Sequence, residues 1–241
     1  MTTDKPTIIP HYPDSIVSNT SCWRASLLLA LCSVILMACG GGVKSGSPLD
    51  QAIKNLGSEL ASERIAGLDG LIAAGSKAKE HASKAVPLLN DDKAKVRAAA
   101  IRVMTSLKHG TPDVLDILVS IVGSDSDPQC KVGALSALEQ LGAKEKFAEA
   151  CAAALKTGAP KLKEHAAMSL AQSENPVPKA QDALIAGCDD KSAVVRMSCV
   201  TALGNLGVDA SDAAKAKLEA LKGDTDEGVK EAVKEALANL K

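Results

Sequence analysis

The sequence predicts an all-α solenoid of about six two-helix repeats stacked side by side. Three observations predict it. First, a basic residue followed by an Ala/Leu-rich stretch recurs six times, at steps of 33, 34, 32, 33 and 34 residues. Second, the apolar residues within each copy follow helical spacing. Third, turn-forming residues separate the copies. A period of this length is typical of a repeat array and removes most enzyme folds from consideration.

The recurring motif marks the second helix of each repeat. Its basic residues are Arg64, Arg97, Lys131, Lys163, Arg196 and Lys230. In the second copy the apolar residues are Val96, Ala100, Val103, Met104 and Leu107, which lie on one face of a helix and would alternate badly in a strand.

Start and stop signals flank these segments. The starts are Asp92, Asp127 before Pro128, Pro160 and Asp190, because an acidic side chain caps free N–H groups and proline suits the first helical turn. The stops are Gly110, Gly142 and Gly207, where glycine readily adopts a left-handed conformation.

A second apolar-periodic segment lies between successive motifs. These segments cover about residues 77–89, 112–122, 144–155, 177–188 and 212–221, with boundaries uncertain by about 2–4 residues. Each repeat is therefore predicted to hold two antiparallel helices and two short turns.

These residues resemble the HEAT-repeat family, and in particular the short HEAT-like repeats first recognised in phycobilisome lyases. The family pattern is an Asp in the inter-helix turn, then Val-Arg, then an Ala/Leu-rich helix that ends in Leu-Gly. The resemblance covers about residues 50–241. It implies an ARM/HEAT-type superhelix and says little about function.

The resemblance also implies a ladder of ion pairs along the stack. Its carboxylates are Asp91, Asp125, Asp190 and Asp224, and the basic residues that follow them are Arg97, Lys131, Arg196 and Lys230. Ser58 and Thr157 stand at the Asp position of the first and fourth repeats, so we expect interruptions there. The alternatives are that these basic residues are ordinary solvated charges or contacts to a ligand.

The first residues are predicted to form a targeting signal. An uncharged apolar run over residues 25–38 is too short to span a membrane and suits the core of a signal peptide. It ends in Leu36-Met37-Ala38-Cys39, which resembles a bacterial lipobox, although Met37 departs from the usual small or β-branched residue. The resemblance implies lipid attachment at Cys39. The alternatives are a plain secretory signal cleaved after Ala38 and a buried helix.

The predicted organisation is thus a lipoprotein-type signal peptide over 1–38, a flexible Gly/Ser-rich tether over 39–49, and the repeat domain over 50–241. Outside the leader the basic and acidic residues nearly balance, and Phe147 is the single aromatic residue. Nucleic-acid binding needs a basic stripe and stacking aromatics, so we expect none.

Residues with catalytic or metal-binding chemistry are sparse. His81, His109 and His165 are scattered without partners at ligand spacing, so we expect no metal site and no cofactor. Outside the leader and Cys39 four cysteines remain, Cys130, Cys151, Cys188 and Cys199, and we expect small buried core residues. Only Cys130 and Cys151 are predicted to lie near enough for a disulfide, because Cys188 and Cys199 should sit about two helical turns apart.

The sequence therefore favours a non-catalytic, lipid-anchored scaffold or adaptor in the bacterial cell envelope, facing the periplasm or the exterior. Its predicted partners are other proteins, together with the membrane through Cys39. Two other functions stay open: an enzyme of the bilin-lyase type or another HEAT-based enzyme, and a purely structural spacer in the envelope.

Overall fold

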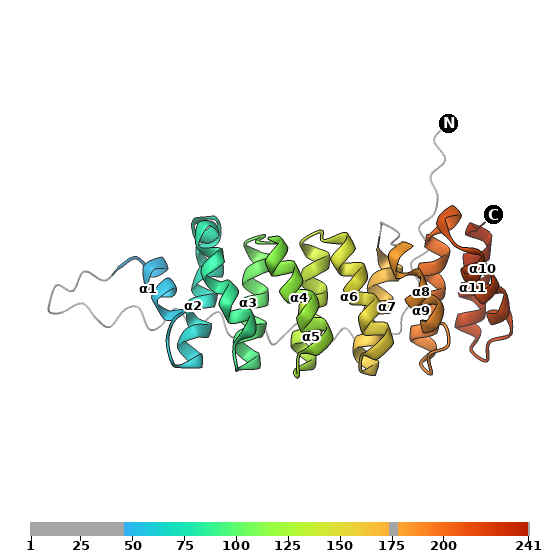
Figure 1. The fold of residues 1–241 in the computed structure, drawn as a ribbon, viewed down its shortest axis with the longest axis horizontal. Coiled ribbons are helices and arrows are strands. Elements are labelled where there is room, and N and C mark those ends of the chain that lie inside the picture. The colour runs from blue at the N-terminus through green and yellow to red at the C-terminus, as the bar shows by residue number, and fades with distance from the viewer. Residues whose placement is uncertain (1–45, 174–177, 241) are drawn as a thin grey trace, which may run out of the picture. The chain divides into compact units, whose positions relative to one another are not determined.

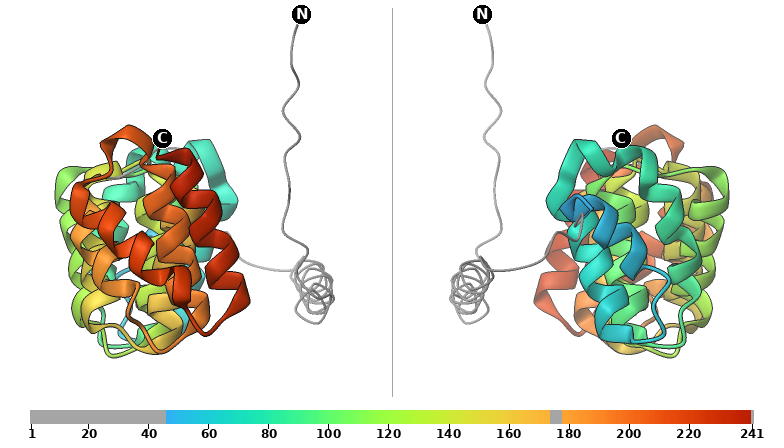
Figure 2. Two further views of the ribbon diagram at one scale, coloured as in Figure 1. Left: turned by 90° about the vertical axis from the view of Figure 1, so that its right-hand side faces the viewer. Right: turned by 90° about the vertical axis from the view of Figure 1, so that its left-hand side faces the viewer.

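A computed structural model describes residues 46–173 and 178–240. These residues form helices arranged in a row, from α1 to α11 in Figure 1. The described part of the chain holds no β-strand, so the predicted all-α solenoid is confirmed. Figure 2 looks along the row from either end and shows the helices of successive units lying behind one another.

Six units of two helices make up the described array. The first helices are α1 (Pro48–Asn55), η2 (Gly75–Asn90), α4 (Pro112–Ser124), α6 (Lys144–Thr157), α8 (Gln181–Gly187) preceded by η3 (Pro178–Ala180), and α10 (Asp212–Ala220) followed by η5 (Leu221–Gly223). The second helices are α2 (Ala61–Ala74), α3 (Ala94–Ser106), α5 (Pro128–Gln140), α7 (Pro160–Gln172), α9 (Ala193–Asn205) and α11 (Glu227–Asn239). A short turn, η4 (Gly207–Asp209), links α9 to α10.

The helix ends follow local chemistry. Ser47 and Asp50 form a capping box at α1, which begins at Pro48, slightly before the predicted domain start. Asp127 caps α5 as predicted, because its side chain accepts hydrogen bonds from the N–H groups of Gln129 and Cys130. Gly142 and Gly207 adopt positive φ angles of 70° and 56°, as their stop role requires.

One stop signal was wrong. Lys108, rather than Gly110, takes the left-handed conformation after α3, with φ 52°. The N–H of His109 bonds the carbonyl of Met104 at 2.8 Å, so the chain leaves the helix two residues before the glycine.

The segment η2 also differs from the predicted α-helix, since it is a 3₁₀ helix. Ala82, Ala85 and Leu88 are buried at steps of three residues. A helix with three residues per turn places every third side chain on one face, so this spacing suits the observed conformation. Pro87 lies inside the segment, where it has no N–H to donate.

A single apolar core runs from Leu56 to Ala236 through all six units. Adjacent second helices pack closely because small residues face one another. A Cβ atom added at Gly204 of α9 would lie 2.6 Å from the Cβ of Ala236 in α11. The glycine is therefore required by the distance between these helices.

We expect Gly204→Ala to lower the free energy of unfolding by about 1–3 kcal/mol, because the added methyl group forces α9 and α11 apart. Gly123→Ala is the matched control: a Cβ at Gly123 meets nothing within 4 Å. This change should leave stability equal or raise it by up to about 1 kcal/mol, since alanine favours a helix more than glycine does. Urea unfolding followed by far-UV circular dichroism measures both. Equal effects of the two substitutions would contradict the close approach.

Candidate functional site

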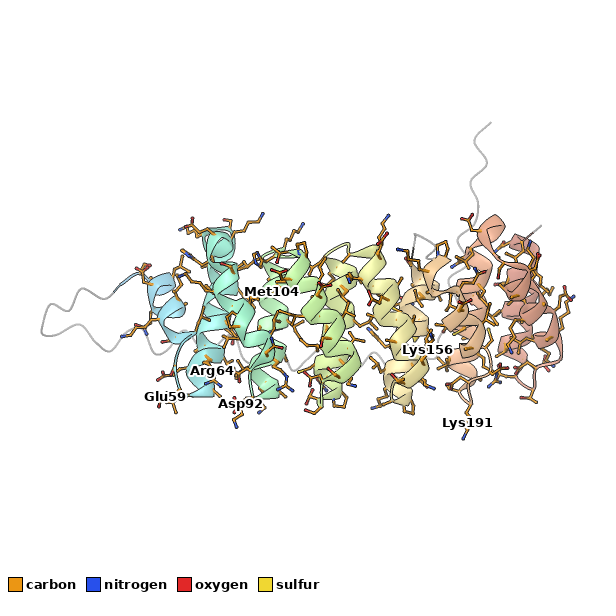
Figure 3. The ribbon with its side chains drawn as sticks, in the orientation of Figure 1. Glu59, Arg64, Asp92, Met104, Lys156 and Lys191 are labelled. Carbon is orange, nitrogen blue, oxygen red and sulfur yellow. The ribbon has the colours of Figure 1, made fainter. Side chains whose placement is uncertain are left out.

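The predicted ladder residues lie along one edge of the array, where turns join the two helices of each unit. We call this row of turns the turn edge; it comprises residues 56–60, 91–93, 125–127, 158–159, 188–192 and 224–226. Figure 3 shows Glu59, Asp92 and Lys191 along this edge, with Arg64 beside them. These repeated turns form one surface that runs along all the units.

Each ladder arginine pairs with a carboxylate of the next unit. Arg97 Nε and Nη2 donate to the two carboxylate oxygens of Asp125, both at 2.7 Å. Arg196 makes the same two-bond contact to Asp224, at 2.9 and 2.7 Å. These side chains are largely buried: Arg97 is 12% exposed and Asp125 is 3% exposed. Two parallel bonds fix the relative position of the turns more firmly than one bond would.

The same arginine also holds its own turn. Arg97 Nη1 donates to the backbone carbonyl of Asp91 at 2.8 Å, and Arg196 Nη1 donates to that of Asp190 at 3.1 Å. Each arginine therefore joins two consecutive turns.

The aspartates act within their own turns as well. Asp125 Oδ1 accepts the N–H of Asp127 at 2.7 Å, and Asp190 Oδ1 accepts that of Ser192 at 2.9 Å. In both cases the N–H belongs to the N-cap residue, which directly precedes the second helix. One carboxylate thus caps a turn and receives a cation from the preceding unit.

These contacts shift the pKa values of the partners. Burial alone would raise the pKa of Asp125, but hydrogen bonds from Arg97 and from the Asp127 N–H outweigh it, so the pKa falls below its usual range. For Asp224 the hydrogen bonds from Arg196 are the main cause, and its pKa is also lowered. The Asp125 contact raises the pKa of Arg97, which keeps its charge.

Each pair joins a cation to the carboxylate of the next unit. The interruption expected at the first repeat is absent, and the one expected at the fourth repeat falls on Lys131, the cation of the third unit. Arg64 of the first unit pairs with Asp91, with Nε 2.8 Å from Oδ2, although that N–H is poorly aligned for a hydrogen bond. Lys163 of the fourth unit pairs with Asp190 at 3.0 Å. Because a cation reaches forward to the next unit, an absent Asp leaves the preceding cation without its partner.

Two predicted ladder members are therefore corrected. Lys131 Nζ donates to the carbonyl of Gly123 at 3.1 Å, and no carboxylate of the described residues lies within ion-pair distance of it. Lys230 pairs with Glu227 on its own helix, since the described array holds no further turn beyond α11.

The break at Lys131 has a local cause. The turn before α7 holds only Gly158 and Ala159, one residue fewer than the turns at 91–93, 125–127 and 224–226. Thr157, which stands at the Asp position in the sequence, is drawn into the last turn of α6. Gly158 is therefore the C-cap of α6, as Asp125 is the C-cap of α4, and it has no side chain to replace the ladder carboxylate. The shortest sequence step, 32 residues between Lys131 and Lys163, signals this shorter turn.

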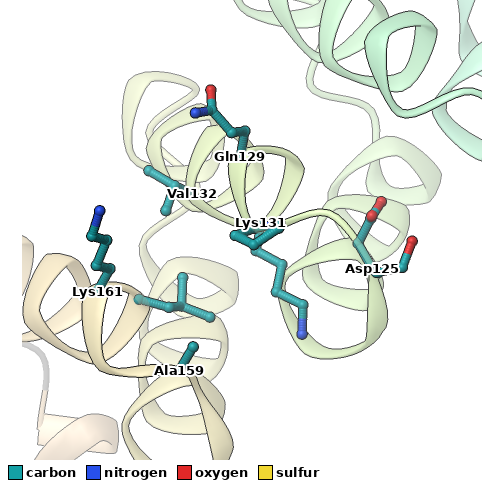
Figure 4. A pocket seen from close by; sticks show the side chains of 9 residues that line it. Asp125, Gln129, Lys131, Val132, Ala159 and Lys161 are labelled. Atoms are coloured by element: carbon teal, nitrogen blue, oxygen red, sulfur yellow. The ribbon is translucent and has the colours of Figure 1, made fainter.

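A groove of about 430 Å³ opens at this break, between the starts of α5 and α7. Figure 4 shows Asp125 and Lys131 on one side, with Ala159 and Lys161 on the other. Pro128, Val132 and Leu162 supply an apolar wall. The groove combines two cations with apolar surface, and sequence reasoning alone did not find it.

The cysteines are core residues. Cys130, Cys151, Cys188 and Cys199 are free and buried, so no Cys130–Cys151 disulfide is present. Burial raises the pKa of Cys130 to about 11 and that of Cys188 to about 12, which keeps both as thiols at neutral pH. The predicted separation of Cys188 and Cys199 was too large, because Cys199 Sγ lies against Gly187, the neighbour of Cys188.

The histidines and acidic residues do not gather into a metal site in the described part of the chain. Within the described residues, no cluster of three or more His, Cys, Asp or Glu side chains could hold a metal ion. His165 Nε2 lies 3.1 Å from Ser136 Oγ. In the same part of the chain no helix has the length and apolar character needed to cross a bilayer. Cys39 and the predicted signal peptide lie outside the described residues.

Known proteins share this architecture. A family model described as HEAT repeats matches residues 50–139, 82–155 and 147–238. A designed armadillo repeat protein in complex with the peptide (KR)4 has a TM-score of 0.57 and 20% identity, over 80% of this chain and 99% of that one. TOG3 of Drosophila melanogaster Mini spindles has a TM-score of 0.51 and 14% identity, over 78% of this chain and 92% of that one.

A mutant of Kap121p is similar as well, with a TM-score of 0.52 and 15% identity, over 81% of this chain and 23% of that one. At these identities the structural matches show the fold alone. No curated protein matches the sequence.

We expect Asp125→Asn to lower the free energy of unfolding at neutral pH by about 2 kcal/mol, because it leaves a largely buried Arg97 without its charged partner. Asp116→Asn is the matched control. Asp116 pairs with Lys146 at 2.9 Å but is 61% exposed, so its loss should cost about 0.5 kcal/mol or less. Urea unfolding compares the two variants. A cost for Asp125→Asn no larger than that of the control would contradict a stabilising ladder.

The cost of Asp125→Asn should also depend on pH. The folded pKa of Asp125 is lowered, so the ionised carboxylate stabilises the fold above the unfolded pKa of about 4, and this contribution disappears as the pH falls through the folded value. The difference in unfolding free energy between wild type and Asp125→Asn should therefore shrink steadily below about pH 4. Unfolding curves measured across this range test it, and a difference that is constant or grows in acid would refute the assignment.

Proposed function

Because the chain belongs to the HEAT-repeat family, we propose that it is a non-catalytic scaffold or adaptor that binds other proteins, anchored by lipid in the bacterial cell envelope. Repeat solenoids of this kind commonly mediate protein binding. The observation that carries the proposal is the turn edge, a surface that runs along all six units and in which Arg64, Arg97 and Arg196 join neighbouring turns. The binding of a peptide by a similar designed repeat protein supports it.

The turns of this surface are held in place before a partner binds. Arg64, Arg97 and Arg196 each join two turns before any partner arrives. A partner that binds a surface already held in place has little ordering entropy to offset, so modest contacts suffice. This matters here because Phe147 is the single aromatic residue after Trp23, and its side chain is buried. The aromatic anchors that dominate many interfaces are thus not available on the described surface.

Anchoring rests on the sequence Leu36-Met37-Ala38-Cys39. Each buried methylene of an acyl chain contributes about 0.8 kcal/mol, so two or three chains at Cys39 hold a protein at a membrane durably. The tether predicted over residues 39–49 would link this anchor to the array, and it would end before Ser47, the N-cap of α1.

We expect the wild-type protein, carrying a C-terminal tag, to fractionate with membranes and to incorporate labelled palmitate. Cys39→Ser should lose both properties because it removes the thiol that is acylated. Chemical cross-linking of the wild type in cells, followed by tag purification, should capture the same partner proteins reproducibly. Membrane association that survives Cys39→Ser would refute the lipid anchor. Failure to capture a reproducible partner would refute the scaffold function.

A further inference from the structure

We propose that the groove between α5 and α7 binds an extended protein segment that presents a carboxylate next to an apolar side chain. The inference rests on the proposed protein-binding function and names the chemistry of the partner. The carboxylate of the ligand would take the place of the ladder aspartate that the turn at Gly158 lacks.

The array itself shows how a carboxylate is bound at this position. At the next junction Asp190 receives the ammonium of Lys163 at 3.0 Å and the N–H of Ser192 at 2.9 Å. The cation comes from the preceding second helix, and the N–H comes from the N-cap residue of the following one. Asp125 and Asp224 are bound in the same way, with an arginine as the cation.

At the groove both donors are present without that carboxylate. Lys131 is the cation at the equivalent position, and among the described residues its ammonium donates to the carbonyl of Gly123 alone. An ammonium has three donor hydrogens, so further bonds are available. Ala159 is the N-cap residue of α7, and none of the described residues accepts a hydrogen bond from its N–H.

The chain has no simple way to supply the carboxylate from its own turn. A Cβ atom at Gly158 would lie 2.4 Å from the carbonyl oxygen of Ala154, which is too close for any side chain unless the backbone shifts. Thr157 lies in the last turn of α6, and its hydroxyl donates to the carbonyl of Ala153 at 3.0 Å. The position therefore stays open on the groove side.

The remaining groove residues define the rest of the ligand. Lys161 adds a second positive charge opposite Lys131 (Figure 4). Asp125 also lines the groove, but two hydrogen bonds from Arg97 compensate its charge. The apolar wall of Pro128, Val132 and Leu162 fits an aliphatic side chain beside the carboxylate. A volume of about 430 Å³ accommodates a few residues of an extended segment.

A defined peptide tests the proposal. The probe is a short, end-capped, fluorescent peptide that alternates leucine and aspartate, and its match carries asparagine in place of every aspartate. Fluorescence anisotropy with the full chain in detergent measures both. We expect the aspartate peptide to bind about tenfold more tightly than its match, which corresponds to one charge-assisted hydrogen-bonded contact.

Three variants locate the binding. Lys131→Gln should abolish the preference for aspartate, and Lys161→Gln should weaken it about threefold, as an exposed charge would. Lys191→Gln removes the same charge from the turn edge outside the groove and should change nothing. Circular dichroism checks that each variant folds. Lys161 is exposed, so its substitution keeps the test valid if Lys131→Gln unfolds.

Several results would overturn the proposal: equal binding of the two peptides, a preference that persists in folded Lys131→Gln, or loss of the preference in Lys191→Gln. The proposal would also be overturned, in favour of a lipid ligand, if phosphatidylglycerol vesicles bound in a way that requires Lys131 while neither peptide bound. The groove proposal can fail while the scaffold function holds. If cross-linking captures partners equally with wild type and Lys131→Gln, the groove assignment is wrong and the scaffold stands.

Discussion

The distance between successive second helices is the constraint on which the array depends. Six short helices can share one core only if their backbones approach closely, and small residues such as Gly204, Ala100 and Ala134 make this approach possible. Smooth faces of this kind have a drawback, because alanine and glycine offer few ridges that would fix how one helix is placed along the next. Close packing therefore supplies the stabilising burial but leaves the alignment of neighbouring units weakly specified.

The cations of the turn edge supply that alignment. Arg97 and Arg196 each bind a carbonyl of their own turn and both carboxylate oxygens of the next. A slide of one unit along its neighbour would break both carboxylate bonds at once, because the carbonyl bond holds the arginine to its own unit. Lys163 keeps the charge pairing with Asp190 but makes only one hydrogen bond to it. The arginine junctions are thus held more strictly than the lysine junctions, and the array is not uniform along its length.

The repeat period and the apolar stripes were sufficient to predict the fold, because both follow from local spacing. Recurrence at one register marked Arg97 and Arg196, and the resemblance to HEAT repeats implied their ladder with Asp125 and Asp224. Their pairing was not predictable, since the direction in which a side chain reaches depends on how units stack and not on which residue lies nearest in sequence. The groove was missed for a related reason: it arises where Gly158 shortens a turn, and its lining residues come from two units. The 3₁₀ geometry of η2 and the left-handed Lys108 differ from what residue propensity alone favours.

The break in the ladder also explains why a ligand at this place would matter to the whole array. Repeat proteins are stabilised by the units themselves and by the interfaces between neighbouring units. The contact between α5 and α7 has no ladder ion pair, whereas the contacts of α3 with α5 and of α7 with α9 each have one. A bound carboxylate would join Lys131 to the start of α7 as Asp125 joins Arg97 to the start of α5. Because such a ligand binds only the folded junction, its binding free energy adds to the cohesion of the third and fourth units. Recognition of a partner and alignment of the array would then depend on the same contact.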